Sequence, residues 1–250
     1  MIVGIIPARY SSTRFPGKAL CDIKGKTMVQ RVYEQAKLST HLHKVVVATD
    51  DQRIVDNVLS FGGEVVMTAS THPSGTDRCW DALQQLKDQY QYVINIQGDE
   101  PFINPKQIDE LAIVLKDNTT ELATQMIAVD SYEMLADEGE VKIVLNTNNE
   151  ALYFSRAIIP YIKNTDKKEW HKHHSYYRHV GMYAYRRDIL EKITKLPVSA
   201  LEKAESLEQL RWLENGFKIK CVTTKFDSHC IDTPEDLQRM LKFMESNNHY

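Results

Sequence analysis

The sequence lacks the features typical of secreted, membrane-spanning and nucleic-acid-binding proteins. Its four cysteines, Cys21, Cys79, Cys221 and Cys230, form no C-x-x-C pair, so we expect reduced thiols in a cytoplasmic protein. No apolar run approaches the ~20 residues that span a membrane, and the apolar start is too short for a signal peptide. The formal net charge of −3 does not indicate general nucleic-acid binding, and the chain has no internal repeat.

The opening stretch also lacks the glycine-rich patterns that commonly hold phosphates. A Walker A loop needs serine or threonine after its Gly-Lys pair, but Gly17-Lys18 is followed by Ala19. The G-x-G-x-x-G turn of dinucleotide-binding proteins is missing as well. If this stretch binds phosphate, we expect it to do so through side-chain charge as well as through its backbone.

The same stretch is rich in cations and hydroxyl groups. Residues 2–6 are apolar and predict a buried strand, which we expect to stop at Pro7 because proline has no backbone donor. Arg9, Arg14 and Lys18 follow, with serine and threonine between them. Ligands of open α/β sheets bind at the carboxyl ends of strands, so this loop is expected to hold a polyphosphate. The alternative is a solvated basic loop.

The first half of the chain alternates between apolar strands and amphipathic helices. This alternation predicts an α/β fold, with a mostly parallel central sheet and helices on both faces. Strands are expected at 2–6, 44–48, 64–67 and 92–97. Helices are expected at 26–39, from Asp51 to Phe61, after residues 72–78 as far as about Tyr90, and at 105–116. Asp50 and Asp51 are interpreted as helix caps rather than catalytic groups.

In the second half the alternation changes. Strands are expected at 121–129, 141–145, 151–154, 178–185 and 217–224, and helices at 199–215 and after the cap Thr233. The turn at 147–150 joins two of these strands into a hairpin, which predicts a mixed sheet. We therefore expect one domain, 1–250, in which about 121–185 includes a hairpin extension.

Three polar segments are candidates for binding. Asp99 follows a buried strand, where a carboxylate is well placed to hold Mg²⁺ against phosphate, although loop aspartates are common after any strand. Ser74-Gly75 allows the backbone to approach a flat ligand, or simply begins a helix with Thr76 as its cap. The histidines of 163–174 match no zinc spacing, so we interpret that segment as a solvated, mobile loop.

The strand expected at 178–185 places an imidazole and phenols on one face. His179, Gly181, Tyr183 and Tyr185 share that face because strand side chains alternate. Such a polar wall suits a sugar. The alternative is a half-buried edge strand in which His179 is merely hydrogen-bonded.

Seven motifs occur in order along nearly the whole chain: IPARYxSTRxPGK at 6–18, HPSGTDR at 72–78, NIQGDEP at 95–101, YFSRA at 153–157, RHVGMY at 178–183, LEQLR at 207–211 and IDTPED at 231–236. Together they resemble the motifs of the bacterial CMP-Kdo synthetases, the 3-deoxy-manno-octulosonate cytidylyltransferases. The resemblance implies a Rossmann-like nucleotidyltransferase fold. It also implies a homodimer, formed through the hairpin and the strands after residue 121.

The resemblance further implies the reaction and its residues. CMP is transferred from CTP to 3-deoxy-D-manno-octulosonate (Kdo) for lipopolysaccharide biosynthesis, with Mg²⁺ as cofactor and diphosphate as the second product. The catalytic residues it implies are Arg9, Lys18, Asp99 and Asp232, of which the two aspartates hold Mg²⁺. The implied CTP-binding residues are Pro7, Ala8, Arg9, Ser11, Ser12, Lys18, Ser74, Gly75 and Gln97. The implied Kdo-binding residues are Arg78, Arg156, His179, Tyr183, Glu208 and Gln209.

Two other functions stay open at this point. The sugar can be another ulosonic acid, such as 8-amino-Kdo or a sialic-type acid, because these residues do not distinguish a hydroxyl from an amine at the far end of Kdo. A nucleotide-binding regulatory module without turnover is a function of a different class. Asp99 and Asp232 together with Lys18 argue against it, because a mere binder has less need of a two-carboxylate metal site.

Overall fold

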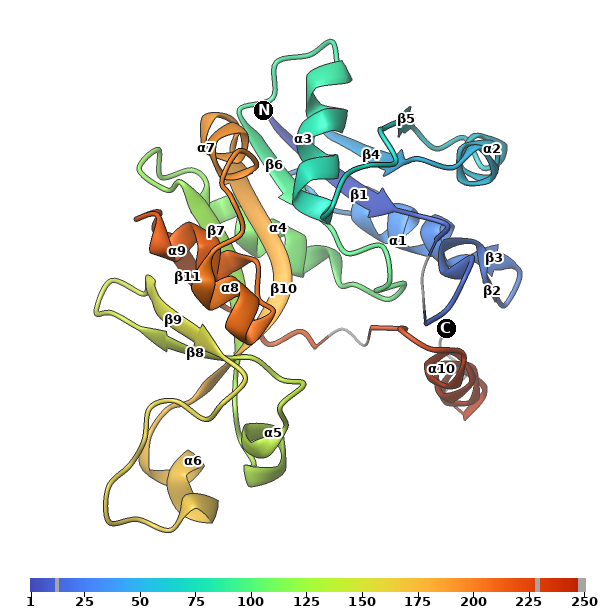
Figure 1. Cartoon of the computed structure of the whole chain (residues 1–250). Coiled ribbons are helices and arrows are strands. Elements are labelled where there is room, and N and C mark those ends of the chain that lie inside the picture. The colour runs from blue at the N-terminus through green and yellow to red at the C-terminus, as the bar shows by residue number, and fades with distance from the viewer. Residues whose placement is uncertain (12–13, 228–229, 247–250) are drawn as a thin grey trace. The chain divides into compact units, whose positions relative to one another are not determined.

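The computed structural model describes residues 1–11, 14–227 and 230–246 (Figure 1). Its contacts divide the chain into two compact units. Unit 1 comprises residues 1–112 and 228–250, and unit 2 comprises residues 113–227. The hairpin extension expected at about 121–185 lies inside unit 2. Among the described helices, none has the length and apolar character needed to cross a membrane.

Unit 1 contains a parallel sheet with the strand order β6-β1-β4-β5 (Figure 1). Its strands are β1 (Ile2–Ala8), β4 (Lys44–Thr49), β5 (Val65–Met67) and β6 (Tyr92–Asn95). The side chains of β1, β4 and β6 are largely buried, as expected of parallel strands that are covered on both faces, whereas those of the edge strand β5 are partly exposed. A separate antiparallel pair, β2 (Asp22–Ile23) and β3 (Lys26–Thr27), lies before the first helix.

The strand predicted at residues 2–6 is two residues longer in the structure, because β1 includes Pro7 and continues to Ala8. The N–H of Ile96 donates to the carbonyl of Ile5 at 2.9 Å, so Ile5 directs its backbone groups toward the β6 side. Pro7 lies two residues further and faces the same side, where β6 has already ended at Asn95. Its missing N–H therefore costs no ladder hydrogen bond.

Unit 1 has five α-helices and a short 3₁₀ helix in its described residues: η1 (Lys18–Leu20), α1 (Met28–Lys37), α2 (Gln52–Ser60), α3 (Gly75–Gln85), α4 (Pro105–Val114) and α10 (Pro234–Ser246). Asp51 caps α2, as predicted. The cap of α3 is Ser74 rather than Thr76, because the Ser74 hydroxyl accepts from the N–H of Asp77 at 3.2 Å. A serine two residues earlier satisfies the same orphan donors and starts the helix sooner.

Helix α10 begins as the sequence predicts. The Thr233 hydroxyl accepts from the N–H of Asp236 at 3.2 Å, and Pro234 takes the first helical position. The Asp236 carboxylate accepts in return from the N–H groups of Asp232 and Thr233 at 3.0 and 2.8 Å. These bonds fix the chain direction at Asp232.

Unit 2 contains the hairpin and mixed sheet that the sequence predicts. Strands β7 (Leu122–Ala128) and β11 (Ile219–Thr223) are parallel, and β10 (Tyr177–Arg186) is antiparallel to β7. Strands β8 (Lys142–Leu145) and β9 (Ala151–Ser155) form the hairpin, and β8 also pairs with β10. A bulge between Val180 and Tyr183 shifts the β10–β7 register.

The described helices of unit 2 are short: α5 (Tyr132–Ala136), η2 (Lys167–Glu169), α6 (Trp170–His173), α7 (Arg187–Ile193), α8 (Ala200–Glu205) and α9 (Gln209–Glu214). One helix at 199–215 was predicted, but Ser206 adopts a left-handed conformation with φ of 55° and divides it into α8 and α9. Segment 163–174 is better anchored than a solvated loop, because Trp170 is buried against Val129, Leu135 and Tyr176.

Candidate active site

Three charged side chains from distant parts of the sequence meet in unit 1. The Lys18 ammonium donates to the Asp99 carboxylate at 2.8 Å and to the Asp232 carboxylate at 2.9 Å. Arg14 pairs with the other Asp232 oxygen at 3.2 Å, but its side chain is mostly exposed. The two carboxylates thus share one firmly held cation and leave one side open to solvent.

Each of these side chains is positioned by its local backbone. Asp99 follows the end of β6, and its carbonyl accepts from the N–H of Ile231 at 2.9 Å. Ile231 is fully buried in a core cluster with Ile23 and Met28, so Asp232 is held beside Asp99. Lys18 follows Gly17, whose φ of 72° is a conformation that favours glycine.

The electrostatics of the cluster favour a charged lysine. Burial by itself would lower the pKa of Lys18, but the charge and hydrogen bond of Asp99, together with those of Asp232, raise it above its ordinary value. Lys18 therefore keeps its positive charge at neutral pH. Lys18 therefore competes with any other cation for the Asp99 and Asp232 carboxylates.

The predicted phosphate loop begins at the end of β1. Pro7 is half-buried and Ala8 buried, whereas Arg9 and Ser11 are exposed; Ser12 lies outside the described residues. Gln97 is half-buried on the neighbouring strand end. Next to it, a Cβ on Gly98 would lie 2.7 Å from the Pro7 carbonyl oxygen. Only glycine allows this close approach between the loops that follow β1 and β6.

The turn before α3 lies against the same strand end. A Cβ on Gly75 would lie 3.5 Å from the Pro7 ring and 3.6 Å from the Asn95 amide, which are ordinary contact distances. The turn is held by His72, whose ring lies 2.6 Å from the Asp81 carboxylate. Asp81 also accepts from the N–H of Ala69 at 2.9 Å. The turn is therefore fixed beside β1 before any ligand arrives.

Arg78 is buried and already has partners within unit 1. Its guanidinium donates to the Thr68 hydroxyl at 2.6 Å and to the Asp50 carboxylate at 3.1 Å. Asp50 was interpreted from the sequence as a helix cap. Its ion pair with Arg78 was not predicted, because no local sequence signal indicates it. The proposed contact between Arg78 and Kdo stays a prediction, and any sugar carboxylate must share the guanidinium with Asp50.

In unit 2, β10 gathers aromatic rings on one face, as the alternation predicts. The His179 ring lies 5.2 Å from the Tyr183 ring, and the Tyr183 ring lies 6.1 Å from the Tyr185 ring. The His179 ring nitrogen is 2.9 Å from the Thr124 hydroxyl. Burial, with a smaller effect of Arg178, lowers the pKa of His179 to about 3, so its ring is neutral at physiological pH.

Helix α9 adds buried donors to this aromatic face. Trp212 packs edge-on against Tyr183 at 5.0 Å, and Gln209 lies three residues earlier on the same side of the helix. Within the described part of the chain, the Gln209 amide nitrogen and the Trp212 ring nitrogen are buried without a hydrogen-bond partner. Burial also raises the pKa of Tyr183, which keeps its hydroxyl protonated. Trp212 was not identified from the sequence.

The remaining predicted sugar-binding residues of unit 2 have protein partners. Arg156 donates to the Glu205 carbonyl at 3.0 Å and to the Glu138 carbonyl at 3.1 Å. Glu208 is half-buried and accepts from Arg211 at 3.4 Å. Arg178, in the β10 motif, is buried between the carboxylates of Glu140 and Asp227.

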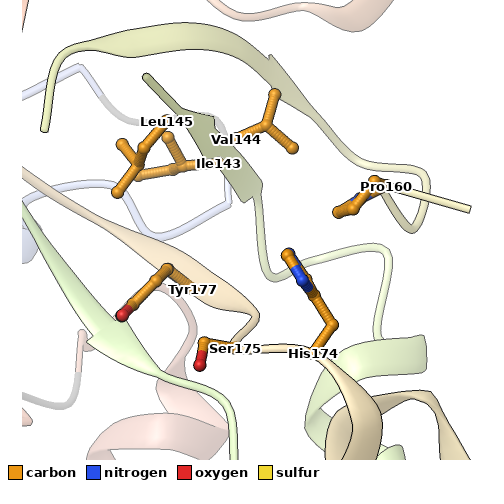
Figure 2. Close-up of a pocket in the computed structure, with 7 residues that line it drawn as sticks. All are labelled: Ile143, Val144, Leu145, Pro160, His174, Ser175 and Tyr177. Carbon is orange, nitrogen blue, oxygen red and sulfur yellow. The ribbon is translucent and has the colours of Figure 1, made fainter. Parts of the chain in front are cut away.

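A pocket of about 390 Å³ lies elsewhere in unit 2 (Figure 2). Its walls come from strand β8, from Pro160, and from the segment that leads into β10; the lining residues are Ile143, Val144, Leu145, Pro160, His174, Ser175 and Tyr177. None of them is among the predicted site residues. The largest part of the lining is apolar, and it offers no pair of carboxylates for a metal.

The carboxylate pair of unit 1 fits a divalent cation. Oxygen atoms of Asp99 and Asp232 and the sulfur of Cys230 all lie within 4.8 Å of one another. The pair already holds the Lys18 ammonium, which shows that a positive charge is accommodated there. Mg²⁺ commonly binds through one or two carboxylates and completes its shell with water and phosphate. These residues therefore fit Mg²⁺.

Comparison with known proteins gives a consistent result. A family model described as Cytidylyltransferase matches residues 3–219. A 3-deoxy-manno-octulosonate cytidylyltransferase of Parabacteroides distasonis is 54% identical over 246 residues, with 97% of each chain covered. An 8-amino-3,8-dideoxy-manno-octulosonate cytidylyltransferase of Shewanella piezotolerans is 46% identical, with 94% of each chain covered.

A solved structure of CMP:2-keto-3-deoxy-manno-octonic acid synthetase complexed with CTP resembles the whole chain. The TM-score is 0.90 at 41% identity, and 98% of each chain is covered. Together with the parallel sheet and the carboxylate pair, these findings define a nucleotidyltransferase. The chain belongs to the cytidylyltransferase family.

Proposed function

We infer that this chain transfers CMP from CTP to Kdo and releases diphosphate. The observation that carries the inference is the meeting of Lys18, Asp99 and Asp232 at the strand ends of unit 1, in a chain with 54% identity to a Kdo cytidylyltransferase. The anomeric oxygen of Kdo bonds to the α-phosphorus of CTP, the bond to the diphosphate oxygen breaks, and the hydroxyl proton passes to solvent. Catalysis of this kind depends on alignment and on charge neutralisation.

Arg9, Lys18, Ser11 and Ser12 bind the triphosphate in this proposal. Arg9 is exposed and has its charge available, and Lys18 exchanges its carboxylate partners for phosphate oxygens when a divalent cation takes its place. The backbone groups of Ser74 and Gly75 bind the edge of the cytosine base, a contact that needs no side chain. The fixed position of this turn beside Pro7 supports this assignment.

Asp99 and Asp232 hold Mg²⁺ in this proposal, and the Asp232 backbone is fixed by the cap of α10. When bound, Mg²⁺ supplies Lewis-acid polarisation of the α-phosphate and neutralises the charge that develops there. The protein contributes two carboxylates that the fold brings together before the ion binds. Lys18 supplies the positive charge beside them.

Unit 2 supplies the sugar-binding residues in this proposal. Gln209 offers a buried amide donor without a protein partner in the described structure, and a buried donor gains most from a ligand hydroxyl. Tyr183 offers a buried hydroxyl group. His179 is neutral and offers a ring nitrogen. Glu208 and Arg156 are the other unit 2 residues in this proposal, and Arg78, a residue of unit 1, stays a predicted contact of Kdo.

The assembly and location of the protein are proposed on family grounds. We propose a homodimer formed through the β8–β9 hairpin of unit 2, where Leu152 exposes 60% of its surface and offers an apolar contact. The thiols are all free, which suits a reducing cytoplasm. CMP-Kdo then serves lipopolysaccharide biosynthesis.

An amino-sugar substrate is the second candidate, favoured by the 46% identity to the Shewanella piezotolerans protein.

Isotope labelling tests the reaction. The chain is incubated with CTP, Mg²⁺ and Kdo in ¹⁸O-labelled water, so that the anomeric oxygen carries the label. Mass spectrometry is expected to find CMP-Kdo with one ¹⁸O between sugar and phosphorus, and unlabelled diphosphate. CMP-Kdo without the label would mean that a phosphate oxygen attacks the sugar, and no CMP-Kdo at all would contradict the proposed function.

Gly75→Ala tests the contact with the base. The added methyl meets only ordinary contacts at 3.5 Å or more, and Gly75 is in the first turn of α3, so the free energy of unfolding should not fall. We expect the Kd of CTP to rise about tenfold, because the methyl lies between backbone and base. The measurements are calorimetric CTP binding and denaturant unfolding. Unchanged CTP affinity would place the base elsewhere.

A further inference from the structure

Cys230 lies beside the two carboxylates and has no part in the proposed reaction. Its sulfur and the Asp99 and Asp232 oxygens all lie within 4.8 Å of one another. The ligand atoms of a tetrahedral zinc site lie about 3.5 Å apart, given bonds of ~2.0–2.3 Å. Small side-chain movements that bring the three atoms closer together would therefore let them share one ion.

Cys230 is exposed, but its backbone position beside the two carboxylates is fixed by the fold. Cys230 precedes Ile231, which is fully buried and whose N–H donates to the Asp99 carbonyl at 2.9 Å. Asp232 follows directly and is fixed by the Asp236 carboxylate. The Lys18 ammonium, bonded to both carboxylates, marks the position where a positive charge is already stabilised.

We propose that Cys230 is a third, sulfur ligand of this metal site, so that the site binds the thiophilic cations Zn²⁺ and Cd²⁺ more tightly than two carboxylates alone would. The proposal rests on the proposed function, which assigns a divalent cation to Asp99 and Asp232. Thiolate ligands select Zn²⁺ and related soft ions, whereas carboxylate and water ligands suit Mg²⁺. On coordination the thiol releases its proton to solvent.

The consequence is a site with two kinds of occupant. Mg²⁺ uses the carboxylate oxygens and leaves the sulfur aside, while Zn²⁺ or Cd²⁺ uses all three ligands. The sulfur thus determines metal selectivity, and it makes the site open to occupation by a thiophilic metal. No motif of the sequence indicates this role, because Cys230 is close to Asp99 only in the folded chain.

The test measures metal binding on the full chain, without nucleotide. Cd²⁺ is titrated by calorimetry and by ultraviolet absorption, where a Cd²⁺–thiolate bond gives a charge-transfer band. The wild type is expected to bind one Cd²⁺ with this band. Cys230→Ser should lose the band and bind Cd²⁺ at least about tenfold more weakly, while its Mg²⁺ affinity changes less than about twofold. Asp232→Asn should also weaken Cd²⁺ binding.

Cys21→Ser is the matched control, because Cys21 is a partly buried thiol that packs against the same core cluster and is absent from the ligand group. It should keep the band and the affinity of the wild type. The proposal is overturned if Cys230→Ser binds Cd²⁺ as tightly as the wild type, or if Asp232→Asn leaves Cd²⁺ binding unchanged. A separate experiment tests the proposed function: if the wild type forms no CMP-Kdo in Mg²⁺, the proposed function is wrong, whatever the result of the Cd²⁺ titration.

Discussion

Asp99→Asn is expected to lower kcat for CMP transfer by about 10²–10³-fold, the cost of removing one preorganised charge-stabilising group. The substitution keeps the size of the side chain and the backbone carbonyl that accepts from Ile231, so the fold should persist. What it removes is one of the two carboxylate charges that hold the cation. Steady-state diphosphate release at saturating CTP and Kdo measures the effect, and denaturant unfolding checks the fold.

Asp56→Asn is the control for this prediction. Asp56 is exposed on α2 and accepts from Gln52 at 2.7 Å, away from the carboxylate pair. Its kcat should equal that of the wild type. If Asp99→Asn instead retained kcat within about threefold, Asp99 would contribute less than ~1 kcal/mol to the transition state, and the cation would have to be held by other groups.

Lys18→Met should lower activity about as much as Asp99→Asn does. Unlike Asp99→Asn, it should strengthen the binding of Mg²⁺. Loss of the ammonium should reduce kcat/KM for CTP by about 10²–10³-fold. Without metal, the two carboxylates lose the ammonium that they share, and only the exposed Arg14 still pairs with Asp232, so the free energy of unfolding should fall by about 1–3 kcal/mol. Mg²⁺ should then stabilise the variant more than the wild type, because no ammonium competes with the ion.

Thermal unfolding with and without Mg²⁺ provides the readout for Lys18→Met. Lys26→Met is the matched control, since Lys26 forms an exposed ion pair with Glu34 at 2.6 Å and touches neither carboxylate of the site. It should leave both activity and the Mg²⁺ response unchanged. An equal Mg²⁺ stabilisation of Lys18→Met and the wild type would mean that the ion does not enter the position that Lys18 occupies.

The strands of unit 1 and the position of Asp99 after one of them could be predicted from local patterns. Buried apolar runs followed by polar loops identify the strands, and the carboxyl ends of parallel strands meet at one edge of a sheet. Asp232 could not be found in this way, because it becomes a neighbour of Asp99 only when Ile231 is buried in the core. The resemblance to a known family supplied what periodicity could not.

Each prediction that was wrong or incomplete has a physical cause that can be named. Pro7 continues β1 because its partner strand has already ended, a fact of sheet geometry and not of the proline itself. Ser206 breaks the predicted helix because it takes a left-handed conformation, although serine gives no strong signal for one. The ion pair between Arg78 and Asp50 was not predicted, because Asp50 lies 28 residues away at the end of another strand.

The first measurement to make is diphosphate release from a matrix of nucleoside triphosphates and sugar acids in Mg²⁺. We expect release only when CTP and a 3-deoxy-octulosonate are both present, and we expect it to be lost in Asp99→Asn. Release with a different sugar acid in place of Kdo would keep the mechanism and replace the substrate. Tight CTP binding with no release for any pair would contradict the account and favour a nucleotide-binding module without turnover.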